Sequence, residues 1–306
     1  MERKTNVKGI VFLVITAVVW GFAFVAQRVG SDHVNTLTFN AIRFALGAVS
    51  LIPVILLFEK GAGDPKIMKT TLLAGLVCGV VLFSASTLQQ YGIELYNKAG
   101  FQDASGRAGF LTALYMVIVP LIGLFIKKRP SAETWCGVVL AVGGLFLISF
   151  SGGFSVSFED IVVIGCALLF AVHIVVIDRF GDNMYSLRFA MTQFAVCSLL
   201  SAAFAGIGIA SGAMEANTFA DIRAALIPIL YGGFMSVGVA YTCQILGQKN
   251  AEPTFASIIL STESMFSAIG GALILNERMT LRGYIGCALI FAGIILTQVR
   301  RGKRAK

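Results

Sequence analysis

Three ionisable side chains lie inside long apolar segments of this chain, where a charge is energetically costly and therefore marks a candidate site. Glu263 follows Pro253 by ten residues, so at about 1.5 Å per helical residue it would lie near the middle of a bilayer core roughly 30 Å thick. A carboxylate there could bind a substrate or exchange protons, or it could hydrogen-bond a neighbouring helix. Arg43 could bind a substrate carboxylate or extend to the lipid headgroups.

His173 is the third of these side chains, and it stands among leucine, valine and isoleucine residues. Such a histidine is usually a packing residue, but one that faced a cavity would respond to pH. Three glutamines, Gln89, Gln193 and Gln244, lie in other apolar segments. Because amide side chains can bridge helices inside a membrane, we expect these glutamines to act in a gate or in helix packing.

Aromatic side chains punctuate the same segments and could form the walls of a substrate path. Trp20, Tyr91, Tyr115 and Tyr241 are therefore candidate substrate-binding residues, together with the three ionisable ones. A cavity with aromatic walls and few charges would suit neutral, zwitterionic or modestly apolar metabolites.

The composition indicates which elements must position these side chains. Hydrophobic residues make up 57% of the 306 residues, charged residues 13%, and the mean hydropathy is +0.84, whereas soluble domains contain about 25% charged residues. A helix that spans a bilayer needs roughly 20 mostly apolar residues, and backbone polar groups in lipid must be paired within the protein, so each such run should be a helix. We therefore predict an all-α integral membrane protein with ten transmembrane helices, at 9–26, 36–58, 70–92, 109–126, 135–158, 161–177, 189–214, 224–247, 254–276 and 283–299.

The basic residues predict the orientation of these helices. With the N-terminus inside, seventeen Lys and Arg residues fall in the inside connections and six in the outside ones. By the positive-inside rule, both termini should face the cytoplasm, across the cytoplasmic membrane. The formal charge of +8 is then a topology signal, so we expect no nucleic-acid partner, and the basic tail at 299–306 would anchor the orientation.

The chain also repeats itself. The pattern Thr-x-Gln-x-x-Gly at 87–92 recurs at 242–247, and further matches downstream keep a constant spacing of 149 residues. This predicts two repeats, at 9–150 and 157–298, of five spans each. Because five is an odd number, the second repeat would enter the membrane from the opposite side, and inverted repeats of this kind usually meet at a substrate site.

Several short motifs keep a characteristic order along the chain: Trp20-Gly21 in the first span, Arg43 in the second, Thr-x-Gln-x-x-Gly in the third, Phe110 to Pro120 in the fourth and Asn276-Glu277-Arg278 before the tenth. Together they resemble the EamA type of the drug/metabolite transporter superfamily. That resemblance implies ten helices in two EamA repeats and the export or uptake of a small metabolite across a cytoplasmic membrane.

These observations favour a secondary transporter that moves an amino acid or a related small organic solute, by alternating access and in the direction of export. The alternative is an intramembrane enzyme that acts on a lipid-like substrate. The six cysteines show no metal-ligand spacing and no phosphate-binding loop occurs, so we expect no metal, no cofactor and no direct use of ATP. The expected partners are the substrate and the lipid bilayer, with protons as a candidate coupling ion, and the protein could be a monomer or a homodimer.

Overall fold

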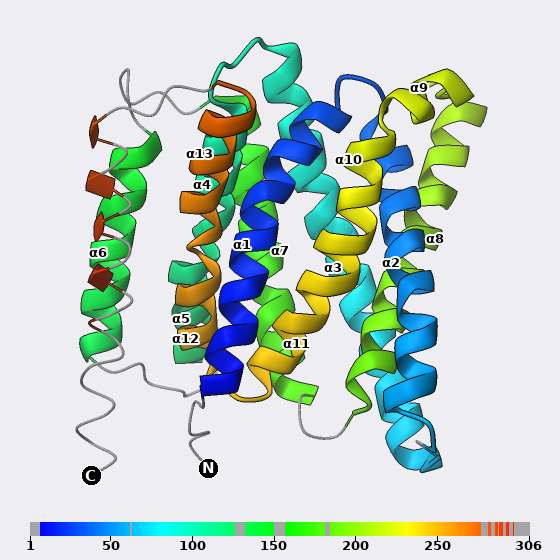
Figure 1. Cartoon of the computed structure of the whole chain (residues 1–306), viewed down its shortest axis with the longest axis horizontal. Helices are drawn as coiled ribbons and strands as arrows, with labels where there is room; N and C mark the ends of the chain where they lie inside the picture. The colour runs from blue at the N-terminus through cyan, green and yellow to red at the C-terminus, as the bar shows by residue number, and fades with distance from the viewer. Residues whose placement is uncertain are drawn as a thin grey trace.

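The computed structural model describes residues 7–61, 63–125, 132–149, 157–180 and 184–276, together with residues 281–282, 285–286, 288–289, 292–293 and 296. The elements formed by these residues are all helices, most of them roughly aligned along one direction (Figure 1). The N-terminal end of α1 and the start of α12 lie at one end of the bundle, and α9 and the end of α13 lie at the other.

The helices follow the predicted apolar runs, with some runs divided into shorter pieces. In chain order they are α1 Val7–Gly30, α2 Thr36–Phe58, α3 Pro65–Lys98, α4 Ala104–Ala113, α5 Tyr115–Phe125, α6 Ala132–Ser149, α7 Phe158–Phe180, α8 Ser186–Ala210, α9 Phe219–Ala224, α10 Leu226–Leu230, the π-helix η1 Tyr231–Tyr241, α11 Thr242–Gln248, α12 Pro253–Leu260 and α13 Glu263–Ile274.

Eight helical segments among the described residues are long and apolar enough to cross a membrane. Three of them are composite: α4 continues into α5, α10 continues through η1 into α11, and α12 continues into α13. The helix α6 has a shorter apolar part, Trp135–Gly144, and stands at one edge of the bundle (Figure 1). Most of the tenth predicted span, 283–299, lies outside the described residues. The multi-pass helical architecture is therefore established, whereas the count of ten and the inverted repeats stay predictions.

The helix boundaries differ from the predicted runs where polar residues continue a helix. The run at 70–92 belongs to a helix of 34 residues, α3, which at about 1.5 Å per residue is longer than the bilayer core is thick. Its start is fixed by Asp64, whose side chain accepts hydrogen bonds from the backbone N–H groups of Lys66 and Ile67. In the run at 135–158, α6 covers residues up to Ser149 and α7 begins at Phe158, and residues 150–156 lie outside the described residues.

Two glutamates tie neighbouring helices together at opposite ends of the bundle. Glu94 of α3 accepts hydrogen bonds from the backbone N–H and the hydroxyl of Thr36, at 3.1 and 2.7 Å, where α2 begins. Glu59, at the end of α2, accepts from the backbone N–H groups of Leu187 and Arg188, at 2.9 and 3.2 Å, where α8 begins. The first N–H groups of a helix have no partner within it, so each carboxylate satisfies donors that would otherwise be unpaired.

The long helices pack in pairs: α2 against α8, α3 against α7 and α8, and α1 against α13 and η1. The approach of α3 to α8 depends on two glycines one turn apart. A Cβ atom on Gly75 would lie 2.7 Å from Thr192 Cβ, and one on Gly79 would lie 2.6 Å from Val196 Cβ. Small residues of this kind allow helices to approach closely in a membrane, where no hydrophobic force drives them together.

We expect Gly79→Ala to reduce the free energy of unfolding by about 1–3 kcal/mol, because the new methyl group overpacks the contact between α3 and α8. The measurement is the unfolding midpoint of the detergent-purified protein. Gly143→Ala is the matched control, since no atom of the described residues lies within 4 Å of a Cβ at that position of α6. An equal loss of stability in both variants would contradict this account of the packing.

Candidate functional site

Two spans are interrupted near their middles, and these interruptions place polar side chains inside the apolar bundle. Leu114 separates α4 from α5, and Ser261 and Thr262 separate α12 from α13. At both places the backbone hydrogen bonds tighten to three-residue steps, from Val117 N–H to the Leu114 carbonyl and from Ser264 N–H to the Ser261 carbonyl. Both α4 and α12 lie beside other helices of the core, so the interruptions are enclosed by protein.

The sequence of α12 and α13 explains the second interruption. Serine and threonine hydroxyls compete with the helical backbone for carbonyl groups and bend a helix. Five such hydroxyls, each 2.7 or 2.8 Å from the carbonyl three residues earlier, follow one another along these two helices: Ser257, Ser261, Thr262, Ser264 and Ser267. This hydroxyl series lets the chain tighten in lipid without leaving its backbone groups unpaired.

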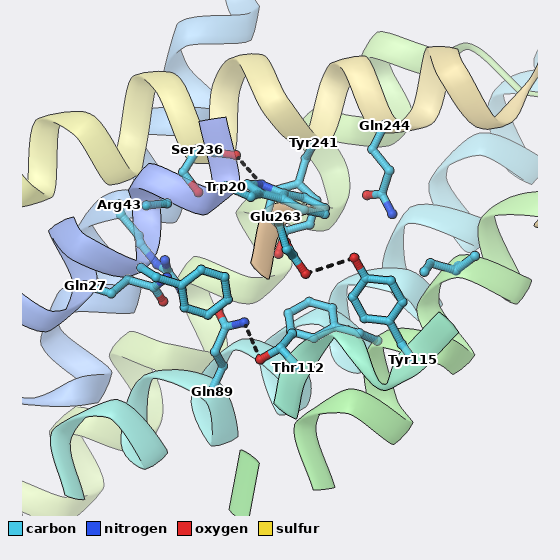
Figure 2. A pocket seen from close by; sticks show the side chains of 14 residues that line it. Trp20, Gln27, Arg43, Gln89, Thr112, Tyr115, Ser236, Tyr241, Gln244 and Glu263 are labelled. Carbon is cyan, nitrogen blue, oxygen red and sulfur yellow. Dashed lines mark hydrogen bonds between the residues drawn. The ribbon is translucent and has the colours of Figure 1, made fainter. Parts of the chain in front are cut away.

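A narrow cavity of about 20 Å³, enough space for about one water molecule, lies where the interrupted spans meet the central helices. Figure 2 shows the side chains converging on it from both halves of the chain. The lining residues are Trp20, Ala23, Phe24 and Gln27 of α1; Arg43 of α2; Gln89 of α3; Thr112 of α4; Tyr115 of α5; Phe170 and Ile174 of α7; Ser236 and Tyr241 of η1; Gln244 of α11; and Glu263 of α13.

Glu263 supplies a carboxyl group to the cavity. The side chain is buried, with the residue 2% exposed, and its Oε1 atom accepts a hydrogen bond of 2.8 Å from the Tyr115 hydroxyl (Figure 2). Glu263 is also the first residue of α13, and the backbone N–H groups of Ser264 and Met265 that follow it are paired with the carbonyls of Ser261 and Thr262. Among the described residues, the Tyr115 phenol is thus the hydrogen-bond partner that holds the carboxyl group in the cavity.

Arg43 supplies a positive charge to the same cavity. It is 3% exposed, and its Nε atom donates to the Asn40 side-chain oxygen at 2.9 Å. The guanidinium carbon lies 5.3 Å from the ring centre of Phe39 and 5.1 Å from that of Phe44, close enough for cation–π attraction. In the described part of the chain, the terminal nitrogens of Arg43 make no hydrogen bond and no ion pair joins Arg43 to Glu263.

Amide groups complete the polar part of the lining. Gln89 donates to the Thr112 hydroxyl at 3.3 Å. The side-chain oxygens of Gln27 and Gln244 are buried and have no hydrogen-bond partner among the described residues. Buried acceptors of this kind are rare in folded proteins, and a ligand or water that donates to them would remove the cost of burying them.

The aromatic walls are themselves fixed by hydrogen bonds and ring contacts. The Trp20 indole N–H donates to the Ser236 carbonyl at 3.1 Å, and its ring meets that of Tyr241 edge-on at 4.6 Å. A carbonyl of η1 is available to accept from a side chain because the π-helix departs from regular α-helical pairing. Phe24 and Phe170 close the wall from α1 and α7.

The structure brings together most, but not all, of the residues singled out from the sequence. Glu263, Arg43, Trp20, Tyr115 and Tyr241 line the cavity, as do Gln89 and Gln244, which were expected to act in gating or packing.

His173, Gln193 and Tyr91 do not line the cavity. His173 is fully buried behind the cavity wall, where its Nε2 atom lies 2.9 Å from the Gln193 side-chain oxygen and its ring meets Tyr241 edge-on at 6.1 Å. Tyr91 is 41% exposed. It follows Gln89 by two residues, which at 100° per residue places it on the opposite face of α3 from the cavity.

Sequence reasoning missed several polar cavity residues, including Gln27, Thr112 and Ser236. A signal for Gln27 was present. It follows Trp20 by seven residues, with Ala23 and Phe24 between them, and that spacing marks a single face of a helix. Ser236 carried no such signal, because its contribution is a backbone carbonyl exposed by the π-helix.

A second polar cluster lies at the end of the bundle opposite the N-terminus, and we call it the Asp160 cluster. Arg107 of α4 donates to both carboxylate oxygens of Asp160 in α7, at 2.7 and 2.6 Å, and the Tyr96 hydroxyl of α3 donates to the same group at 2.5 Å. The cluster therefore joins three helices next to the start of α7. It contains no cavity residue. Within the described ranges, no three His, Cys, Asp or Glu side chains gather as metal ligands.

Comparison with known proteins identifies relatives along the whole chain. A family model described as the EamA-like transporter family matches residues 7–150 and 157–299. An uncharacterized transporter of Archaeoglobus fulgidus is 28% identical over 94% of this chain and 85% of its own. A probable terminal-alkyne amino-acid exporter of Streptantibioticus cattleyicolor is 26% identical over 96% of this chain and 94% of its own. A crystal structure with 16% identity covers 99% of this chain and 100% of its own with a TM-score of 0.77, which shows the same fold.

We expect Tyr115→Phe to reduce the free energy of unfolding by about 1–3 kcal/mol, because it leaves the buried Glu263 oxygen without its donor. Tyr91→Phe should change stability little, since that tyrosine is exposed and its hydroxyl makes no hydrogen bond with the described residues. The free energies of unfolding of both variants and the parent are compared by chemical unfolding in detergent. Equal stabilities for Tyr115→Phe and the parent would show that the phenol does not hold the carboxyl group.

Proposed function

The chain belongs to the EamA-like transporter family, and on that premise we propose that it is a secondary transporter that exports a small organic metabolite by alternating access. The observation that carries the proposal is the cavity at the centre of the bundle, with one acidic and one basic side chain among amide, hydroxyl, aromatic and apolar lining residues. Buried charges in a membrane protein usually mark a substrate or ion path. An amino acid or a related small solute fits such a lining, and a relative named as an amino-acid exporter supports this class.

We propose that the transporter consists of two inverted five-helix repeats, 9–150 and 157–298, that rock against each other around this cavity. The packing of the helices supports this arrangement. Helix α1 packs on α13 and α12, the interrupted span of the second half, while α7 packs on α4 and α5, the interrupted span of the first half. The cavity then lies between the halves, and side chains from both halves line it.

The Asp160 cluster is a candidate outer gate. It links α3 and α4 of the first half to α7 of the second half. If the N-terminus is cytoplasmic, as the basic residues predict, this end of the bundle faces outward. Opening the cavity in that direction would require Arg107 and Tyr96 to separate from Asp160, a step that costs free energy because Asp160 is buried.

Protons are the coupling ion that the lining best supports, because Glu263 is the one acidic side chain among the described residues that line the cavity. An enzymatic function finds less support, since the relatives compared above are named as transporters. We place the protein in the cytoplasmic membrane with both termini in the cytoplasm.

Transport by the purified protein in liposomes tests the proposal. We expect exchange of radiolabelled amino acids without any soluble cofactor, and we expect Glu263→Gln to reduce it about tenfold or more, since a buried charged partner is lost. Glu263→Gln should also make the remaining rate independent of pH, because its amide does not titrate. Gln89→Ala is the matched control within the same cavity and should have a milder effect. Equal, mild effects of both substitutions would remove Glu263 from the site.

The orientation is tested by labelling introduced cysteines in intact cells with a membrane-impermeant thiol reagent. In a variant without the native cysteines, Asp32→Cys should react from outside, because it lies in the connection between α1 and α2. Lys60→Cys, in the connection between α2 and α3, should react only after the membrane is opened. The reverse pattern would place the N-terminus outside.

A further inference from the structure

The cavity holds two opposite charges that do not neutralise each other. Arg43 comes from α2 in the first half and Glu263 from α13 in the second, and no ion pair joins them among the described interactions. Figure 2 shows why: the guanidinium group lies beside Gln27, whereas the carboxyl group turns towards Tyr115. Each charge is held in place by its own neighbour, Asn40 in one case and Tyr115 in the other.

Both charged groups keep unused hydrogen-bonding capacity. The terminal nitrogens of Arg43 carry four N–H donors that have no acceptor in the described part of the chain. Glu263 uses Oε1 to accept from Tyr115, and no described residue donates to its second oxygen. The unpartnered oxygens of Gln27 and Gln244 add two further acceptors on the same cavity. The lining thus offers a fork of donors at Arg43 and acceptors at Glu263 and Gln244, while Gln27 lies beside Arg43 (Figure 2).

We propose that this cavity binds a zwitterionic amino-acid head group, with the carboxylate on Arg43 and the ammonium group on Glu263. This inference rests on the proposed transport function and names the substrate class of the same site. A guanidinium fork matches a carboxylate in two parallel hydrogen bonds. An ammonium group has three donors, of which the free Glu263 oxygen and the Gln244 oxygen can accept two.

The physical reason for selectivity is the cost of leaving a buried charge unpaired. A simple amine would satisfy Glu263 and leave Arg43 without an anion, and a simple acid would do the reverse. A site built from buried polar groups rejects an analogue that lacks their partner more strongly than it rejects a change of apolar size. The ligand that satisfies both charges at once is a zwitterion.

The two halves contribute unequally, and this gives the bound substrate a direction. Gln193 of α8 stands where Arg43 stands in the first repeat, and Leu114 stands where Glu263 stands in the second. The charges are therefore not repeated at the mirrored positions. A substrate can satisfy both only with its carboxylate towards α2 and its ammonium group towards α13, while the rings of Trp20 and Phe170 remain for its side chain.

Ligand binding to the whole chain in detergent tests the inference without relying on transport. The chain has two tryptophans, so Trp135→Phe leaves Trp20 in the cavity wall as the only indole reporter. We would follow its fluorescence during titration with leucine, with 3-methylbutylamine, which lacks the carboxylate, and with 4-methylpentanoate, which lacks the amine. Alanine, ethylamine and propionate form a second, smaller set. The amino acid of at least one set should bind about tenfold or more tightly than both of its analogues.

Two variants identify which charged side chain binds the carboxylate of the ligand and which binds its ammonium group. Arg43→Gln, which introduces the residue found at the mirrored position, should make the amino acid and the amine bind alike. Glu263→Gln should make the amino acid and the acid bind alike. Arg43→Lys and Glu263→Asp keep the charges and should keep the preference, and Arg28→Gln is a control arginine outside the cavity. Thermal melting of each variant shows that it is folded, and the ligand series on the Trp135→Phe protein decides the question even if a variant does not fold.

The outcomes separate this inference from transport itself. Equal binding of an amino acid and its two analogues, or no binding of either amino acid, would overturn the head-group assignment even if the liposomes carry another solute. Selective binding of an amino acid by a protein that moves no solute would support the assignment and refute the transport proposal.

Discussion

The organisation of this protein depends on the cost of placing charge inside an apolar helical bundle. Arg43 and Glu263 are buried almost completely, and each has its own protein partner. Pairing the two with each other would have been the simplest compensation, but it would have filled the centre of the cavity. Holding them apart leaves both available to a ligand, at the cost of a site that is incompletely satisfied without one.

The interrupted helices make this arrangement possible. Between α12 and α13 the helix tightens to three-residue steps directly before Glu263, the first residue of α13. The serine and threonine hydroxyls donate to the carbonyl groups at the interruption. These carbonyl groups therefore stay hydrogen-bonded where no water is present, and the interruption can exist inside the membrane. The first half has an interruption at Leu114, and the residues on either side of it, Thr112 and Tyr115, line the same cavity as Glu263. The polar side chains at the centre of the bundle thus lie next to helix interruptions in both halves.

Different forces hold the periphery of the molecule. Glutamates pair with the unpaired N–H groups at the starts of α2 and α8, and Asp160 joins three helices near one end. Between these ends the contacts are apolar and close, with glycines where α3 meets α8. Polar contacts at the ends and close packing along the length are compatible with the rigid-body motion proposed above, because such interactions have discrete alternatives and do not deform gradually.

The sequence by itself determined the helical membrane class of the protein and pointed to Arg43 and Glu263 as candidate site residues. Apolar runs of spanning length have only one backbone solution in lipid, so helices and their approximate positions could be predicted, and a charge in such a run is rare enough to mark Arg43 and Glu263. The tertiary structure decided which side chains share a cavity. It placed Tyr91 outside and His173 behind the wall, and it brought in Gln27 and the Ser236 carbonyl. Side-chain neighbours depend on helix rotation, interruptions and a π-helical stretch, and these arise from packing between segments far apart in the sequence.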